Sequence, residues 1–227
     1  MADKDYFKRA LPLKSLYKIA FKVRRNIFNI FMDNINPEPY EKIVDIGVFA
    51  GSTDPNQNYL EHLYPHSGQI TAVGIDDASF LQQQYPGLKF VKVIAHTRLP
   101  FEDNQFDIGF SSATIEHAGS MEDQKFFMEE AIRVSKRLFL TSPNRYFPLE
   151  FHTLLPFLHW LPQRIFRRIL KDIKLEFYSK EENLNLLGKN ELLSLVPTQY
   201  KAKARLLSYR LLGVTSNLIL ILNKENI

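Results

Sequence analysis

The chain has 227 residues, of which 45% are hydrophobic and 24% charged, so it is long and apolar enough for one well-cored domain with some appendage. It contains no cysteine, which excludes disulfides, thiolate zinc sites and cysteine nucleophiles. The formal net charge of +4 is unevenly spread, because residues 1–36 carry +5 and residues 151–175 carry +4, leaving −5 for the rest.

The first expected element is an amphipathic basic helix within residues 1–36. Apolar side chains recur at roughly helical spacing from Leu13 to Phe31, and a second face carries basic residues (Lys14, Lys18, Lys22 and Arg25). The Asn36-Pro37 pair should end this helix. We therefore predict an N-terminal helix over residues 1–36, followed by a single domain over residues 37–227.

From residue 42 onward, short apolar strands alternate with helices. The expected strands cover residues 42–47, 70–76, 90–94, 106–111 and 137–141. We expect a helix after Asp54-Pro55, with Asp54 as its N-cap, and further helices over residues 78–84 and 121–135. This alternation is typical of a doubly wound α/β fold, in which a parallel sheet is covered by helices on both faces.

The alternation stops after Pro143. Residues 147–187 form an aromatic and basic insertion, with a helical run whose inner face we expect to hold Ile165, Phe166, Ile169 and Ile173. A short helix over residues 189–195 follows. Two final strands over residues 203–212 and 216–222, joined at Gly213, should form a hairpin at the sheet edge.

Ligands of open α/β sheets bind outside the carboxyl ends of the strands. The first strand ends at Asp45-Ile46-Gly47, and the second ends at Asp76. Glycine allows a close approach of the backbone to a ligand, and a carboxylate suits the two vicinal hydroxyls of a ribose. A glycine after a strand is also ordinary turn chemistry, so these features alone leave both interpretations open.

A more specific pattern follows. Residues 99–107 read LPFEDNQFD and residues 111–117 read SSATIEH. Together with Asp45-x-Gly47 and Asp76, this combination resembles the signature of class I S-adenosylmethionine (SAM) dependent methyltransferases over about residues 40–145. The nearest branch includes the ubiquinone and menaquinone biosynthesis methyltransferases. Residues 142–148, 150–153 and 181–187 look like a poorly characterised bacterial subgroup of these enzymes.

The resemblance implies a Rossmann-like sheet of seven strands in the order 3-2-1-4-5-7-6, with the last strand antiparallel, and SAM as cofactor. It assigns the methionine end of SAM to the loop after the first strand, the ribose to the end of the second strand, the adenine to the end of the third, and the region near the sulfonium to the end of the fourth. The implied cofactor residues, in that order, are Asp45, Gly47, Val48 and Gly51; Asp76 and Asp77; Ala95, His96 and Thr97; and Ser112 and Ala113.

The sequence departs from the family pattern at two positions. Phe49 stands where the family loop usually has its middle glycine, and Ala95 stands where an aspartate usually binds the adenine amine. Either change could weaken SAM binding or mark a domain without catalysis. The alternative to an enzyme is therefore a degenerate methyltransferase fold that serves as a binding or scaffold protein. A third alternative, an NAD or nucleotide-sugar enzyme, is disfavoured because no G-x-G-x-x-G motif is present.

The candidate catalytic residues are two histidines. His117 follows the fourth strand, where a methyl acceptor should approach, and it is our first candidate for a general base or an orienting group. The alternative is that it only packs beneath the loop. His152 and Arg145 follow the fifth strand and should face the same side, whereas Glu116 is expected to be structural. No cluster has the spacing of a metal site, so we predict no metal.

The acceptor expected for this domain is a small molecule or a lipid- or glycan-linked intermediate, methylated at oxygen or carbon. The insertion combines aromatic and basic residues, which is typical of a lid that also rests on an anionic membrane surface. The simpler alternative is a cover over the cleft with its basic residues in water. Nucleic acid is the least favoured partner, because no recognition motif is present. We expect a cytoplasmic protein, either free or peripheral at the inner face of the membrane.

Overall fold

The computed structural model describes residues 14–54 and 56–225, and for residues 14–17 it describes the backbone only. Seven strands form one sheet in the order β3-β2-β1-β4-β5-β7-β6. The strands are β1 (Ile43–Ile46), β2 (Ile70–Gly74), β3 (Lys89–Lys92), β4 (Phe106–Ser112), β5 (Ser135–Pro143), β6 (Ala204–Leu211) and β7 (Val214–Asn223). Pairing is parallel except that β7 runs antiparallel to both β5 and β6. The expected strand order and the antiparallel last strand are confirmed.

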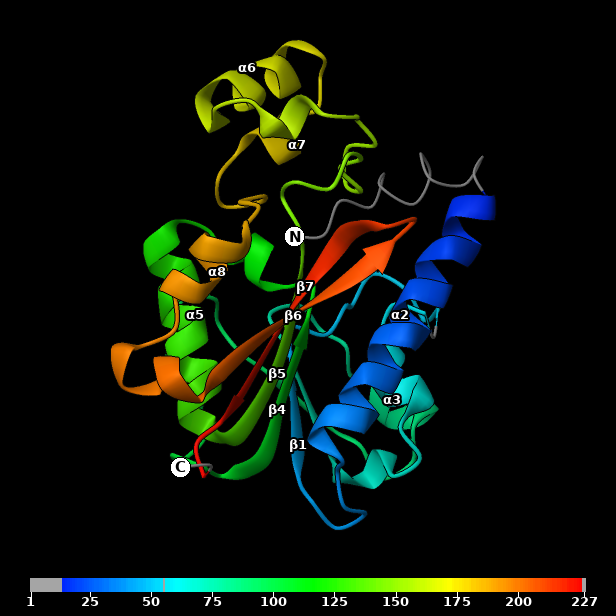
Figure 1. The fold of residues 1–227 in the computed structure, drawn as a ribbon. Helices are drawn as coiled ribbons and strands as arrows, with labels where there is room; N and C mark the ends of the chain where they lie inside the picture. The colour runs from blue at the N-terminus through cyan, green and yellow to red at the C-terminus, as the bar shows by residue number, and fades with distance from the viewer. Residues whose placement is uncertain (1–13, 55, 226–227) are drawn as a thin grey trace.

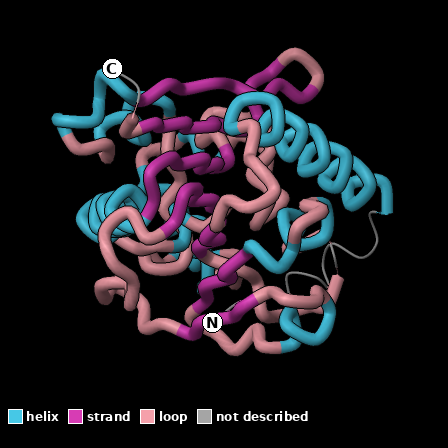
Figure 2. The backbone as a smooth tube through the Cα atoms, turned by 90° about the horizontal axis from the view of Figure 1, so that it is seen from below, coloured by secondary structure: helices cyan, strands magenta, loops and turns pink. Residues whose placement is uncertain are grey.

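Helices cover both faces of this sheet (Figures 1 and 2). The long helix α2 (Lys14–Ile35) and the short helices α3 (Tyr59–Leu63) and α4 (Phe80–Gln84) pack on one face. Helices α5 (Met121–Val134) and α8 (Lys189–Ser194) pack on the other. The part of the predicted N-terminal helix before residue 14 lies outside the described residues. Short 3-10 turns, η1 (Ser67–Gln69) and η4 (Thr198–Lys203), precede β2 and β6.

The helix α2 is held to the sheet by aromatic packing. Phe31 is fully buried, and its ring lies edge-on to Phe110 of β4 and Phe139 of β5 at centroid distances of 5.2 and 5.3 Å. Edge-to-face contacts of this kind add to the free energy gained by burying the rings. The opposite core is mostly aliphatic, and its α5 side chains include Met128 and Ile132. The apolar face of α2 therefore covers one face of the sheet.

A separate unit stands above the carboxyl ends of β4 and β5. This unit, which we call the cap, comprises residues 147–187 and contains η3 (Leu158–Trp160), α6 (Gln163–Asp172) and α7 (Glu176–Ser179). It has a small core of its own, made by Phe166, Leu170, Tyr178, Leu184 and Leu186. Figure 1 shows α6 and α7 apart from the helices that flank the sheet. The insertion after the fifth strand therefore stands over the carboxyl ends of the neighbouring strands.

Two local expectations were wrong. The helix after β1 begins at Tyr59 with Asn58 as N-cap, whereas Asp54 accepts a hydrogen bond from the Asn56 amide in a tight turn; Pro55 lies outside the described residues. The predicted burial of Phe166 on α6 is confirmed, but Ile165 and the C-cap residue Ile173 are 49% and 46% exposed, and Leu170 is buried in their place. Among the described residues, no helix has the length and apolar character needed to cross a bilayer.

Candidate active site

The turn after β1 brings the backbone into the position expected of a cofactor loop. Gly47 has φ of +102°, and the amides of Gly47 and Val48 both donate to the Val73 carbonyl, at 2.8 and 3.0 Å. A side chain at Gly47 would collide with Thr114, which follows β4. Glycine is therefore required here by conformation and by space.

Phe49, which replaces the middle glycine of the family loop, is held in place by hydrogen bonds to its backbone. The Asn58 side chain accepts from the Phe49 amide at 2.8 Å and donates to the Phe49 carbonyl at 2.9 Å. The Phe49 ring lies against Gly51, where an added Cβ would meet the ring. Asn58 is a site residue that sequence reasoning missed, although its position one residue before α3 is a signal for a loop-closing amide. The loop is thus held in one conformation by a side chain from α3's N-cap.

Two buried carboxyl groups meet beneath this loop. Asp45 of β1 is 7% exposed and Glu61 of α3 is 1% exposed. Burial raises the pKa of Asp45 well above its usual value, and the neighbouring Glu61 raises it further. Burial also raises the pKa of Glu61, to about 7. Neither Glu61 carboxylate oxygen meets a hydrogen-bond donor among the described residues, so ionising both acids together is unfavourable and the pair favours keeping a proton.

The predicted ribose carboxylates differ in their surroundings. Asp76 is exposed just beyond β2, and its carboxylate makes no hydrogen bond within the described part of the chain. Asp77 instead accepts from the Ser79 amide at 2.9 Å, and this bond lowers its pKa. Asp76 is therefore the one available to a ligand, while Asp77 caps the turn into α4.

The predicted adenine segment follows β3 after two further residues. Ala95 is exposed, and His96 adopts a left-handed conformation with φ of +59°. His96 Nδ1 lies 3.1 Å from the Asp123 carboxylate near the start of α5, and Thr97 donates to the Ile94 carbonyl at 2.8 Å. The role of these residues at the adenine stays a prediction.

The end of β4 closes the floor of the site. The Ser112 hydroxyl receives a hydrogen bond from the buried Tyr59 at 3.0 Å and lies 3.0 Å from the Thr141 hydroxyl on β5. The Ala113 amide donates to the Thr141 carbonyl at 2.9 Å with φ of +51°. These contacts join α3, β4 and β5 at the point where the resemblance places the sulfonium.

The structure brings the two candidate catalytic histidines together. His117, in η2 (Ile115–His117), and His152, in the loop after β5, have their Nε2 atoms 3.1 Å apart with the rings nearly perpendicular. Burial and the nearby charge of His152 lower the pKa of His117 to about 4. Burial also acts to lower the pKa of His152, but the Glu150 carboxylate outweighs it and raises that pKa. The sequence named both residues but could not show that they touch.

Two acids that we did not count as site residues lie beside this pair. Glu150 is 3% exposed and accepts from His152 Nδ1 at 2.6 Å and from the Thr153 amide at 2.6 Å. Burial alone would raise the pKa of Glu150, but the charge of His152 and these hydrogen bonds lower it to about 2. Glu116 is fully buried, and burial raises its pKa to about 7. The signal for Glu150 was its spacing, two residues before a candidate histidine.

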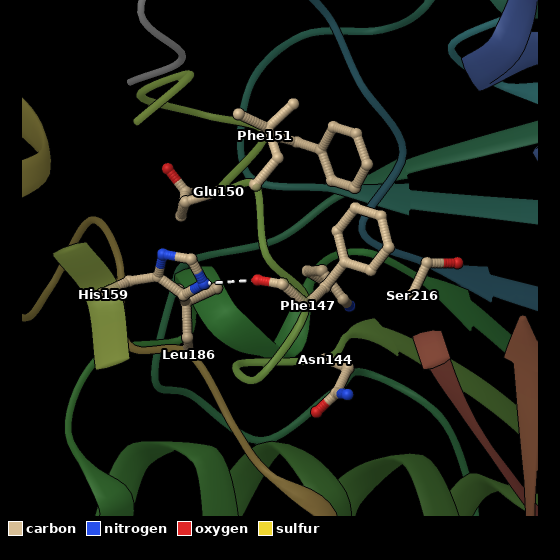
Figure 3. A pocket seen from close by; sticks show the side chains of 9 residues that line it. Asn144, Phe147, Glu150, Phe151, His159, Leu186 and Ser216 are labelled. Atoms are coloured by element: carbon tan, nitrogen blue, oxygen red, sulfur yellow. Dashed lines mark hydrogen bonds between the residues drawn. The ribbon is translucent and has the colours of Figure 1, made fainter. Parts of the chain in front are cut away.

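A small pocket lies beside this cluster at the base of the cap (Figure 3). It has space for about one water molecule, and its walls include Glu150, Phe147, Phe151 and His159. The Phe147 and Phe151 rings stack 5.4 Å apart, and His159 Nε2 donates to the Phe147 carbonyl at 2.7 Å, as the dashed line shows. The aromatic residues that we predicted to form a lid therefore also fix the loop that carries His152.

The predicted site residues lie in one region, but Arg145 makes structural contacts there. Arg145 pairs with Glu191 of α8 at 3.5 Å and donates to the Leu161 carbonyl at 3.3 Å, so it ties the cap to the body. The remaining predicted residues lie at the carboxyl ends of β1 to β5, as expected for this type of sheet.

Comparison with known proteins agrees with this geometry. Residues 48–138 match the family model described as a methyltransferase domain. No curated protein matches the chain. A SAM-dependent methyltransferase from Thermotoga maritima superposes with a TM-score of 0.53 at 17% identity, covering 97% of this chain and 98% of that one.

Two further solved structures show how widely the fold is shared. A SAM-dependent methyltransferase from Methanosarcina mazei gives a TM-score of 0.51 at 17% identity, over 82% of this chain and 94% of that one. The 4+2 cyclase SpnF gives 0.51 at 16% identity, over 80% of this chain and 57% of that one. At these identities the likeness concerns the fold, which does not by itself fix a reaction.

Proposed function

We propose that this chain is a class I methyltransferase that binds SAM and transfers its methyl group to a hydroxyl of an acceptor bound beneath the cap; the family-model match and the shared fold support this proposal. The observation that carries the proposal is the contact between His117 and His152, whose Nε2 atoms lie 3.1 Å apart at the carboxyl ends of β4 and β5. Imidazole is the usual side chain for accepting a proton near neutral pH.

The residues at the end of β1 fit SAM. Gly47, with its positive φ, leaves open the space that a side chain would fill, so the backbone can approach a ligand. We assign the two ribose hydroxyls to the exposed Asp76 carboxylate, because a carboxylate can accept from both.

The chemistry asks little of the protein beyond positioning. SAM supplies an activated methyl group, and in the transfer the sulfur–carbon bond breaks as the oxygen–carbon bond forms. The hydroxyl proton of the acceptor must leave, and the histidine pair is the base at hand. Glu150 holds His152 in place and supports the positive charge that the pair gains.

The proposal is tested by following the transfer of labelled methyl groups from SAM to a panel of hydroxylated acceptors, both water-soluble and polyprenyl-linked. We expect transfer by the native chain, and a loss of at least about a hundredfold in His117→Gln and His152→Gln with SAM binding unchanged. Equal rates in the variants would contradict the role of the pair. The exposed His62 of α3, changed to Gln, is the matched control.

For the acceptor we propose a lipid-linked molecule presented at an anionic membrane surface. The cap exposes Phe157, Trp160, Ile165 and Ile173, each by 45% or more. Four exposed cations stand on or beside α6 among these apolar residues: Arg164, Arg168, Lys171 and Lys174. Apolar side chains that enter the interface and cations that meet anionic headgroups are the two components of peripheral binding.

Vesicle sedimentation tests this surface. We expect the chain to bind vesicles that contain anionic phospholipid and to bind neutral vesicles weakly, with binding that falls as salt rises. Replacing Arg164, Arg168 and Lys171 by Glu should abolish the binding. Binding that ignores lipid charge, or that survives these changes, would favour the simpler interpretation of a cover over the cleft.

The second candidate function is a binding or scaffold protein with this fold. The Phe49 ring that lies against Gly51 favours it, because the ring stands in the loop that should receive the methionine end of SAM. Calorimetry with SAM and S-adenosylhomocysteine separates the two. Heat of binding supports the enzyme, and a folded chain that binds neither ligand supports the scaffold.

A further inference from the structure

Three polar side chains converge at the base of the cap. One carboxylate oxygen of Glu116 and one ring nitrogen each of His117 and His152 lie within 4.8 Å of one another. Glu116 and His117 stand together in η2 directly after β4, whereas His152 comes from the loop after β5. Because 35 positions separate the two histidines, no local spacing in the sequence announced this cluster.

Both imidazole rings are oriented by hydrogen bonds at their other nitrogen. His117 Nδ1 lies 2.6 Å from the Asn183 backbone carbonyl, and a carbonyl can only accept, so this nitrogen carries a proton. His152 Nδ1 lies 2.6 Å from Glu150, whose oxygens also accept from the backbone amides of His152 and Thr153. Glu150 is therefore a carboxylate, and His152 Nδ1 also carries a proton.

The consequence is that two nitrogen lone pairs face each other. With both protons on Nδ1, each neutral ring presents an unprotonated Nε2 to the other at 3.1 Å. Such an arrangement needs a cation between or beside the two nitrogens. A shared proton and a metal ion are two such cations. A histidine that donates its second ring nitrogen to a carboxylate or a backbone carbonyl is the usual arrangement at metal sites.

Glu116 supplies the observation that favours a metal. Its side chain is fully buried, and among the described residues Oε1 has no hydrogen-bond partner, while Oε2 meets only the Ser142 hydroxyl at 3.4 Å. An unpartnered carboxylate oxygen in the interior is costly. A single shared proton would satisfy the histidines and leave this oxygen unpaired, whereas an ion bound by all three groups would satisfy both.

We propose that Glu116, His117 and His152 form a binding site for a divalent transition-metal ion, with zinc as the best match. Two imidazoles and one carboxylate are a ligand set that zinc uses in open catalytic sites, while magnesium and calcium prefer oxygen alone. Tetrahedral zinc with bonds of about 2.0 to 2.1 Å places two nitrogens roughly 3.4 Å apart, near the 3.1 Å found here. Glu116 would close the remaining gap by a small rotation.

The open position of such an ion would face the acceptor. Although the His117 ring lies deep enough for burial to lower its pKa, part of the residue is exposed, so an ion there has a route from solvent. With both Nε2 atoms bound to an ion, the histidines would no longer accept the hydroxyl proton themselves; the ion would instead lower the pKa of an acceptor hydroxyl bound to it, and the proton would pass to water. The site does not depend on the methyl transfer proposed above, because ion binding is measured without SAM or acceptor.

The test uses the full chain after treatment with a chelator. Zinc is titrated by calorimetry and cobalt(II) by visible absorption. We expect one ion per chain and the intense cobalt bands of a four-coordinate site. Each of Glu116→Gln, His117→Gln and His152→Gln should weaken binding by at least about tenfold, and Glu150→Gln should weaken it by about ten- to a hundredfold through the orientation of His152. His62→Gln should bind as the native chain does.

The contrary outcomes are distinct. If the folded native chain binds neither ion, the two histidines share a proton and the inference fails. If zinc binds equally to the native chain and to His117→Gln, the ion lies elsewhere on the surface and the inference fails again. Far-UV circular dichroism establishes that each variant is folded, and Glu116→Gln keeps the volume of the buried side chain. A native chain that binds zinc but transfers no methyl group would count against the proposed reaction alone.

Discussion

The acid pair at the end of β1 predicts an unusual dependence of stability on pH. Glu61 is 1% exposed, and burial raises its pKa from 4.5 to about 7. Between these two values the folded chain keeps a proton that the unfolded chain has released, so stability falls as pH rises. The contribution is fully present below pH 4.5 and is lost as pH passes through about 7. At about 1.4 kcal/mol per pH unit, the loss is roughly 3 kcal/mol.

Glu61→Gln should remove this loss. Glutamine keeps the shape of the side chain, and it cannot ionise beside Asp45. We expect the variant to match the native chain near pH 4.5 and to exceed its free energy of unfolding by roughly 3 kcal/mol at pH 8.5. Urea denaturation followed by circular dichroism, without SAM, measures both curves. The exposed Glu122→Gln on α5 is the control. A difference between native chain and Glu61→Gln that stays constant across this pH range would refute the reasoning.

Two further changes test the loop that should hold the cofactor. Gly47→Ala should destabilise the chain by more than about 1 kcal/mol and abolish SAM binding, because the new Cβ meets Thr114. The control Gly213→Ala is also at positive φ but lies in open space, so it should leave SAM binding intact. Thermal melting measures the stability of both variants, and calorimetry measures their SAM binding. Asn58→Ala removes both hydrogen bonds to the Phe49 backbone and should cost about 1 to 3 kcal/mol in urea unfolding. Unchanged stability would show that Asn58 does not hold the loop.

The layout of the sheet followed from the sequence because its determinants are local. Short apolar runs that end in Gly47 or Asp76 mark buried parallel strands, and each strand covers at least part of its expected range. The strand order came from the family resemblance, since periodicity alone does not say which strands are neighbours. The ends of the helices were less predictable, because Asp54 has the chemistry of an N-cap but forms its own turn.

The cap shows where periodicity fails. The spacing of Ile165, Phe166, Ile169 and Ile173 predicted one buried face, but the cap core selects Phe166 and Leu170. A unit as small as the cap has room for only a narrow apolar stripe. The apolar residues left outside are those that a partner surface would cover, and only the three-dimensional structure distinguishes them.

The active-site cluster was predictable in part. His117 and His152 were chosen because each follows a strand, and the carboxyl ends of neighbouring strands meet. Their contact, the support from Glu150 and the unpaired oxygen of Glu116 depend on a loop of irregular backbone after β5, which no period describes. Glu61 escaped notice for a similar reason, because a charged residue on a short helix normally faces water.

The central claim is that the carboxyl ends of β1 and β2 hold SAM, and calorimetric titration with SAM and S-adenosylhomocysteine tests it most directly. We predict binding of one ligand per chain with a Kd on the order of micromolar, about −8 kcal/mol. Asp76→Ala should weaken it by about ten- to a hundredfold, because a carboxylate that accepts from two hydroxyls is lost. A folded native chain that binds neither ligand, or an Asp76→Ala variant that binds as well as the native chain, would contradict the account.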